Sequence, residues 1–169
     1  VARALEGRVV QLSPRAKGRY HAAAVLASNL VVSLVALAAR EARAVCVADA
    51  ERLLAHLARG ALTSVGELGS VKALTGPLVR GDRLTLAQHL SALTKPARRI
   101  YALLSMEALG SLTAGKLSRA QRAELRQLLG NYSNLSEKQT INRRGLRGLH
   151  CGDGAWRQRR ASASCEWRA

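Results

Sequence analysis

The sequence predicts an all-α fold, a bundle of helices around an aliphatic core, and three observations support this. Apolar residues recur at spacings of three and four, which is the period of an amphipathic helix. Long alternating runs of Val, Ile and Thr, typical of β-sheets, are missing. Hydrophobic residues make up 48% of the 169 positions but aromatic residues only 3%, so Leu, Val and Ala must build the core.

The chain begins with a short β-prone run, Val9 to Leu12, that ends at the turn signal Ser13-Pro14. An isolated strand is not stable without a partner. We therefore expect residues 1–12 to be the residual end of another domain, the main part of which this chain lacks.

The strongest apolar feature is an uncharged run of 18 residues, from Ala22 to Ala39. Its length is at the lower limit for a membrane span, and a secretion signal is a further alternative. The run is rich in Ala, however, and Ser28 and Asn29 interrupt it near its middle. A helix that is apolar on nearly all sides is equally typical of a buried helix in a soluble bundle, which is the interpretation that we favour.

The next helix is predicted over 49–67, with Asp49 as N-cap and Gly66 and Gly69 as its end. Residues 73–82 contain Gly76-Pro77 and Arg80-Gly81-Asp82, which predict a shaped loop.

Three further helices follow that loop. Asp82 is expected to cap one that begins near Arg83, and Pro96 to open another within its first turn. Ser118 and Gln121 form a capping-box pattern for a last helix ending at Gly130. Residues 13–130 thus form one helical domain.

Residues 131–169 are poor in aliphatic side chains and rich in Gly and Arg, which predicts a basic tail with little packed structure. His150, Cys151 and Cys165 lie in this tail, but they lack the paired spacing of a zinc site. We expect no metal site, and the tail is either disordered or an aberrant extension.

The net charge of +16, from 27 basic and 11 acidic residues, raises the question of nucleic-acid binding. The basic residues are spread over the whole chain, whereas nucleic-acid binders usually cluster them on one face with stacking aromatics. No Gly-rich phosphate loop that follows a strand, no metalloprotease motif and no nucleophile elbow is present. We therefore expect no nucleic-acid partner.

Two polar groups remain as candidates for chemistry. On one helix, His21 and Asn29 would lie on the same side, two turns apart, with Ser28 beside them. His titrates near neutral pH and can move a proton, and Asn can orient a substrate oxygen. The alternative is a structural pair whose hydrogen bonds are satisfied inside the core.

The second group comprises Thr75, Arg80, Asp82 and His89. A loop beside the same pocket would let Arg80 hold an anionic group of the substrate. The alternative is a helix cap with solvated charges around it.

Two segments, YHAAAVLASN from Tyr20 to Asn29 and ALTGPLVRGDRLTLAQHLSAL from Ala73 to Leu93, resemble a known family. They resemble the C-terminal domain, described as one of unknown function, of proposed oxidoreductases with a Rossmann-like nucleotide-binding domain. That family is similar to ketopantoate reductase, pyrroline-5-carboxylate reductase and the C-terminal superfamily of 6-phosphogluconate dehydrogenase. The similarity covers about residues 1–110.

The resemblance implies a helical domain of the 6-phosphogluconate dehydrogenase C-terminal type that forms a homodimer through helix 22–39. It implies that residues 9–12 are the last strand of a missing Rossmann domain. The full-length family would bind NAD(P) and transfer a hydride to or from a small carbonyl, imine or hydroxy compound in the cytoplasm. The chain alone is expected to bind no cofactor and to be inactive, and no membrane contact is expected.

The same resemblance suggests roles for individual residues. His21 and Asn29 match the family's catalytic positions, while Ser28, Thr75, Arg80 and Asp82 would bind substrate. Relatives use a Lys one turn before the Asn, where this chain has Val25, so His21 would have to move the proton. The alternatives are a non-enzymatic helical interaction module and a basic nucleic-acid-binding protein.

Overall fold

A computed structural model describes residues 11–133, and within that range every regular element is a helix. The all-α prediction is therefore confirmed. Residues 1–10 lie outside the described range, so the predicted strand cannot be located, and Gln11 and Leu12 have no regular structure. The predictions for 134–169, including those for His150, Cys151 and Cys165, also fall outside it.

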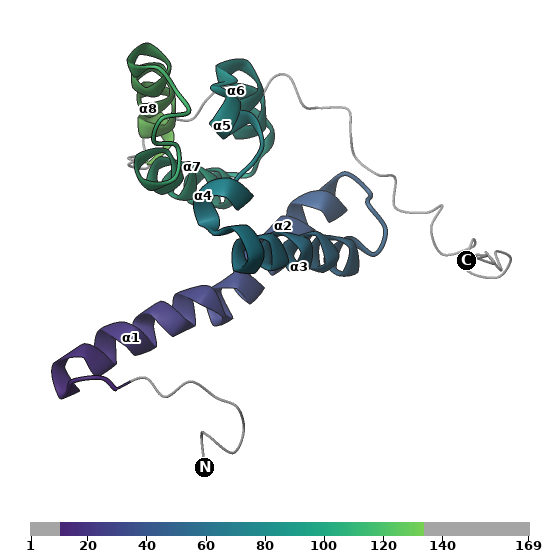
Figure 1. The fold of residues 1–169 in the computed structure, drawn as a ribbon. Helices are drawn as coiled ribbons and strands as arrows, with labels where there is room; N and C mark the ends of the chain where they lie inside the picture. Colours follow the sequence, from purple (N-terminus) through teal and green to yellow (C-terminus); the bar gives the residue numbers. More distant parts are fainter. Residues whose placement is uncertain (1–10, 134–169) are drawn as a thin grey trace, which may run out of the picture.

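The N-terminal part consists of α1 (Pro14–Ala27), α2 (Asn29–Ala44) and α3 (Ala50–Leu68). Helices α1 and α2 follow one another along nearly one line, and α3 returns beside α2 (Figure 1). The Ser13 side chain caps α1 by accepting a hydrogen bond from the backbone N–H of Ala16 at 3.3 Å.

The remaining helices are α4 (Ser70–Ala73), α5 (Pro77–Arg80), α6 (Arg83–Ala92), α7 (Lys95–Ser111) and α8 (Arg119–Ser133). Helices α7 and α8 pack against one another, and α5 and α6 cover them (Figure 1). The short helix α5 thus lies inside the region 73–82 that is predicted as a loop only, and α4 ends at the first residue of that region. The last helix runs three residues past Gly130, because a glycine lowers helix stability without necessarily ending the helix.

The residues that were predicted to start the last two helices, α7 and α8, are found at those helix starts. Pro96 lies in the first turn of α7. Ser118 and Gln121 form the expected reciprocal capping box: the backbone N–H of Ser118 donates to Oε1 of Gln121 at 3.0 Å, and that of Gln121 donates to Oγ of Ser118 at 3.2 Å.

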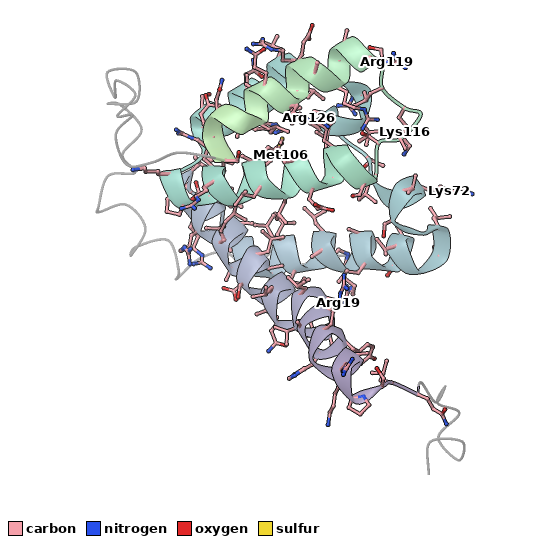
Figure 2. All side chains as sticks on the ribbon, turned by 90° about the vertical axis from the view of Figure 1, so that its left-hand side faces the viewer. Arg19, Lys72, Met106, Lys116, Arg119 and Arg126 are labelled. Carbon is pink, nitrogen blue, oxygen red and sulfur yellow. The ribbon has the colours of Figure 1, made fainter. Side chains whose placement is uncertain are left out.

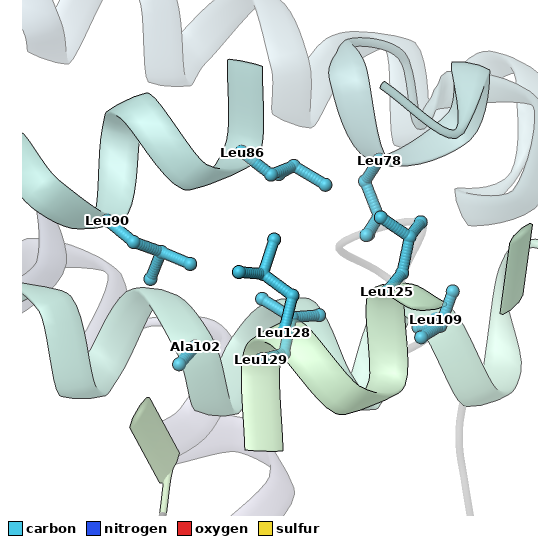
Figure 3. Packing of buried hydrophobic residues seen from close by; sticks show 8 residues of the cluster. All are labelled: Leu78, Leu86, Leu90, Ala102, Leu109, Leu125, Leu128 and Leu129. Carbon is cyan, nitrogen blue, oxygen red and sulfur yellow. The ribbon is translucent and has the colours of Figure 1, made fainter. Parts of the chain in front are cut away.

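The main core lies between α5, α6, α7 and α8 and is made almost entirely of leucine (Figure 3). Its buried members are Leu78, Leu86, Leu90, Ala102, Leu109, Leu125, Leu128 and Leu129. The prediction of an aliphatic core without Phe is confirmed, because Leu side chains from four helices fill this space.

The expectation of a buried helix over 22–39 is not met within one chain. Only Leu37 and Ala39 of this run are buried, and α1 has no buried residue. The physical reason is that α1 packs only against the start of α2, so no second layer covers it. The stretch Pro14–Ala44 has the length and apolar character that a membrane-crossing helix needs, a test that soluble core helices and signal sequences also pass.

Candidate functional site

The first predicted group lies at the junction of α1 and α2. Ser28 has non-helical backbone angles (φ −124°, ψ −79°) and separates the two helices. Its hydroxyl lies 2.7 Å from the carbonyl oxygen of Ala24 and 2.9 Å from Oδ1 of Asn29, and can donate its proton to either. Ser and Asn often offer the backbone such local alternatives to helical hydrogen bonds, which explains a break at this point.

His21 and Asn29 are both exposed in this chain. His21 lies on α1, and Asn29 opens α2, so the two side chains are carried by different helices. A histidine that moves a proton usually acts where water is excluded, and no described element covers His21. Any pocket at this junction therefore needs a further surface.

The second predicted group lies on a turn between α5 and α6 that has a defined geometry. Gly76 and Gly81, both with positive φ, flank the single turn of α5, and Asp82 follows directly as N-cap of α6. Oδ1 of Asp82 accepts a hydrogen bond from the backbone N–H of Thr85 at 3.0 Å, and Oδ2 accepts from the Thr85 hydroxyl at 2.7 Å. The predicted cap is thus confirmed.

The charge state of Asp82 follows from these contacts. The hydrogen bond from the Thr85 side chain, the one from its backbone N–H and the positive charge of Arg80 lower the pKa of Asp82 below its usual value. Asp82 is therefore a stable carboxylate, whereas Arg80 and Thr75 are exposed. Among the described residues, this turn presents the exposed guanidinium of Arg80 to an anion but does not enclose a ligand.

The structure does not bring the two predicted groups together within one chain. Helix α1 packs against α2, whereas α5 and α6 pack against α7 and α8 at the opposite end of the molecule (Figure 1). The prediction of one shared pocket is therefore not supported by a single copy. Only the Arg80–Asp82 group is held in a defined geometry.

Two polar residues near this turn were not singled out from the sequence: Thr85 and Tyr101. Nδ1 of His89 lies 3.0 Å from the Tyr101 hydroxyl, and the two rings meet edge to face. Burial raises the pKa of the Tyr101 phenol. The spacing of Asp82, Thr85 and His89 along one helix face was the available signal, but the partner Tyr101 lies on another helix.

One open hollow of about 690 Å³ lies at the turn between α2 and α3. It is lined by the ion pairs Arg43–Glu51 at 2.9 Å and Arg52–Asp49 at 3.5 Å, all exposed to solvent. Asp49 precedes α3 as predicted, but its side chain does not cap the helix. Within residues 11–133, no three His, Cys, Asp or Glu side chains are grouped to hold a metal ion.

The described residues do not fit an NAD(P) site. A dinucleotide is usually held by a Gly-rich turn between a strand and a helix, with the pyrophosphate at the helix N-terminus. The positive-φ glycines of this chain, Gly69, Gly76, Gly81 and Gly115, join helices to helices, and the described range contains no strand.

Comparison with known proteins gives one family. Residues 1–108 match the model of a family described as a domain of unknown function (DUF2520). No match is found among curated proteins or among solved structures.

Proposed function

Since the chain belongs to the family of this domain of unknown function, we propose that it is the helical dimerisation and substrate-site domain of an NAD(P)-dependent oxidoreductase. The reaction would be hydride transfer on a small carbonyl, imine or hydroxy compound. The nucleotide would be held by a separate Rossmann-like domain, because the described residues do not fit it.

The observation that carries the proposal is the unpartnered apolar surface of α1 and α2. Leu26 and Val32 are 62% and 70% exposed, and Leu30 and Leu34 lie close to them along the chain. Soluble monomers rarely leave several large apolar side chains exposed on neighbouring turns, and such a surface usually marks a contact with a protein or a membrane. A homodimer through helix 22–39 would cover this surface.

Dimerisation would also supply the further surface that a pocket at the α1–α2 junction needs. His21 would donate or accept the proton, Asn29 would orient the substrate oxygen, and Ser28 would add a hydroxyl contact. Arg80 would hold an anionic group of the substrate, with Asp82 and Thr75 beside it. The separation of the two groups in one copy means that residues from two copies, or a second domain, must complete the pocket.

The test uses the longer gene product that includes the codons upstream of Val1, compared with the 169-residue chain. We expect NADPH to bind the longer protein, measured by nucleotide fluorescence, and not the shorter one. In the longer protein, His21→Ala should lower kcat while Arg80→Ala should mainly raise KM for an anionic substrate. Absence of nucleotide binding by the longer protein contradicts the proposal.

The second candidate is a non-enzymatic helical interaction module, which the exposed apolar surface also supports. It predicts self-association without nucleotide binding in either protein. A basic nucleic-acid binder predicts instead binding to duplex or single strands that weakens steeply as salt rises. Titration of a fluorescent duplex at low and high salt separates this third alternative from the other two.

A further inference from the structure

Helix α1 projects from the body of the molecule without a packing partner of its own. Its 14 residues include no buried one, and among the described helices it packs only against α2 (Figure 1). Arg15, Arg19, Ala22 and Leu26 follow one another at spacings of four, three and four, so they share one face. This face, which we call the arm face, is basic at its start and apolar at its end.

Hydrogen bonds near both ends of α7 connect its flanking residues to α2 and α4, the helices that precede and follow α3. Near its start, the Glu41 carboxylate of α2 accepts from the backbone N–H of Thr94 at 3.0 Å and from its hydroxyl at 2.5 Å. Beyond its end, Nζ of Lys116 donates to the carbonyl oxygen of Val71 at 2.6 Å. Because α2 leads into the start of α3 and Val71 follows its end, α3 and α7 run in the same direction (Figure 2).

Both of these helices leave an apolar row exposed. On α7, Ile100, Leu103 and Leu104 are 40%, 47% and 51% exposed. They lie on the side opposite the buried core residues Ala102 and Leu109, and only Ala97, at the start of this side, is buried. On α3, Leu53, Leu57 and Leu68 fall on one side of the helix and are exposed as well. We call these six exposed residues, on two helices that run in the same direction, the receiver strip.

Two exposed acids lie at one end of the receiver strip. Glu107 follows Leu103 and Leu104 at spacings of four and three, so it shares their row, and Glu67 directly precedes Leu68. Neither forms an ion pair in the part of the chain that the structure describes. Both lie towards the C-terminal ends of their helices, where the helix dipole also favours a positive charge.

The spacing along the two surfaces matches. Arg19 and Leu26 are seven residues apart on the arm face, and Ile100 and Glu107 are seven apart on the strip. Both separations correspond to about 10 Å of helix. An antiparallel arm would therefore set its arginines beside the acids and its leucine beside the apolar end.

Resting on the dimerisation in the proposed function, we propose that two copies of this chain exchange their arms, with α1 of each copy packed antiparallel on the receiver strip of the other. The arm cannot reach the strip of its own copy in this conformation, because α1 continues the line of α2 away from α3 and α7 (Figure 1). Exchange of an identical element is a common route to a symmetric dimer. In this dimer the contact through helix 22–39 is made by its first part, residues 22–27 of α1, which packs on the receiver strip of the partner.

A charge-exchange experiment on the 169-residue chain tests the proposal. The arm variant is Arg15→Glu/Arg19→Glu, the receiver variant is Glu67→Arg/Glu107→Arg, and Glu124→Arg on the exposed side of α8 is the matched control. Sedimentation equilibrium of the parent chain should give twice 18.1 kDa. Each variant alone should raise the dissociation constant of the dimer by about tenfold or more, because like charges then meet in both arm–strip contacts.

A 1:1 mixture of the arm and receiver variants should restore the dimer, since every contact in the mixed pair joins opposite charges. If both variants dimerise as tightly as the parent, or if mixing restores nothing, arm exchange is wrong while dimerisation stands. If the parent is monomeric at all concentrations, dimerisation itself fails and arm exchange with it. A monomeric parent that floats with anionic phospholipid vesicles would assign the arm to a lipid surface instead.

Discussion

The two parts of this molecule contain similar leucine-rich helices but bury them very differently. In α5 to α8, eight apolar side chains form one closed cluster. In α1 to α3, the buried residues are Leu37, Ala39 and Ala50, while leucines such as Leu53 and Leu57 remain exposed. A pair of helices can cover only one side of each member, whereas a third layer closes the core. Helix composition alone therefore does not decide burial.

Polar contacts follow the same division. In the C-terminal part, Arg122 and Arg98 donate to carbonyl oxygens at the C-terminal ends of α7 and α6, and Arg98 also stacks over Tyr132. In the N-terminal part, the two ion pairs are exposed and hold only the α2–α3 turn. Exposed ion pairs contribute little to stability, so the C-terminal part should be the more stable one.

The largest expected effect comes from a cavity in the leucine core. Leu90→Ala should lower the free energy of unfolding by about 2–5 kcal/mol, because Leu90 is fully buried and its neighbours can collapse only partly. Leu84→Ala, at a 69% exposed position of the same helix, should change it by less than about 0.5 kcal/mol. Urea denaturation followed by circular dichroism measures both, and equal losses would contradict the core assignment.

Removal of the Arg122 side chain should have the next largest effect. Its Nη1 and Nη2 donate to the carbonyl oxygens of Leu109 at 2.7 Å and Thr113 at 2.9 Å. Arg122→Ala leaves both acceptors without this partner and should lower the free energy of unfolding by about 1–3 kcal/mol. Arg126→Ala, exposed on the same helix, is the control and should be close to neutral. The same denaturation curves decide whether the two variants differ.

Gly81→Ala should destabilise the turn before α6 by about 1–2 kcal/mol. Gly81 has φ +71°, and an added Cβ would lie 2.7 Å from Nε2 of Gln121, the side chain that completes the capping box of α8. Gly60→Ala, inside α3 with open space around it, should instead stabilise slightly, by about 0.5–1 kcal/mol. Changes of the same sign in thermal melting temperature would contradict this account.

The smallest effect is a pH dependence at Asp82. Because its folded pKa lies below the usual value of 3.8, the carboxylate stabilises the fold above that pH. That contribution is lost as the pH falls through the lower, folded pKa. Asp82→Ala should thus have a lower melting temperature than the parent at pH 7, and the difference should shrink below about pH 4. A difference that stays constant down to pH 2 would show that the cap is not the carboxylate.

The start signals of the C-terminal helices were predictable because each depends on chemistry within a few residues. Asp82 with Thr85, Pro96, and Ser118 with Gln121 all act over three or four positions. The paired contact of His89 with Tyr101 was not predictable, because it joins two helices. The separation of His21 from the Asp82 turn was not predictable either, because it depends on the direction of α2 relative to the C-terminal helices.

The sequence by itself determined the all-α class, the aliphatic nature of the core and the caps that start α6 and α8, since these follow from helical period and local hydrogen bonding. The tertiary structure decided which leucines are buried, because burial depends on how many layers surround a helix. It placed Leu86 and Leu90 inside a closed core and left Leu26, Leu57 and Leu104 on the surface of a single copy.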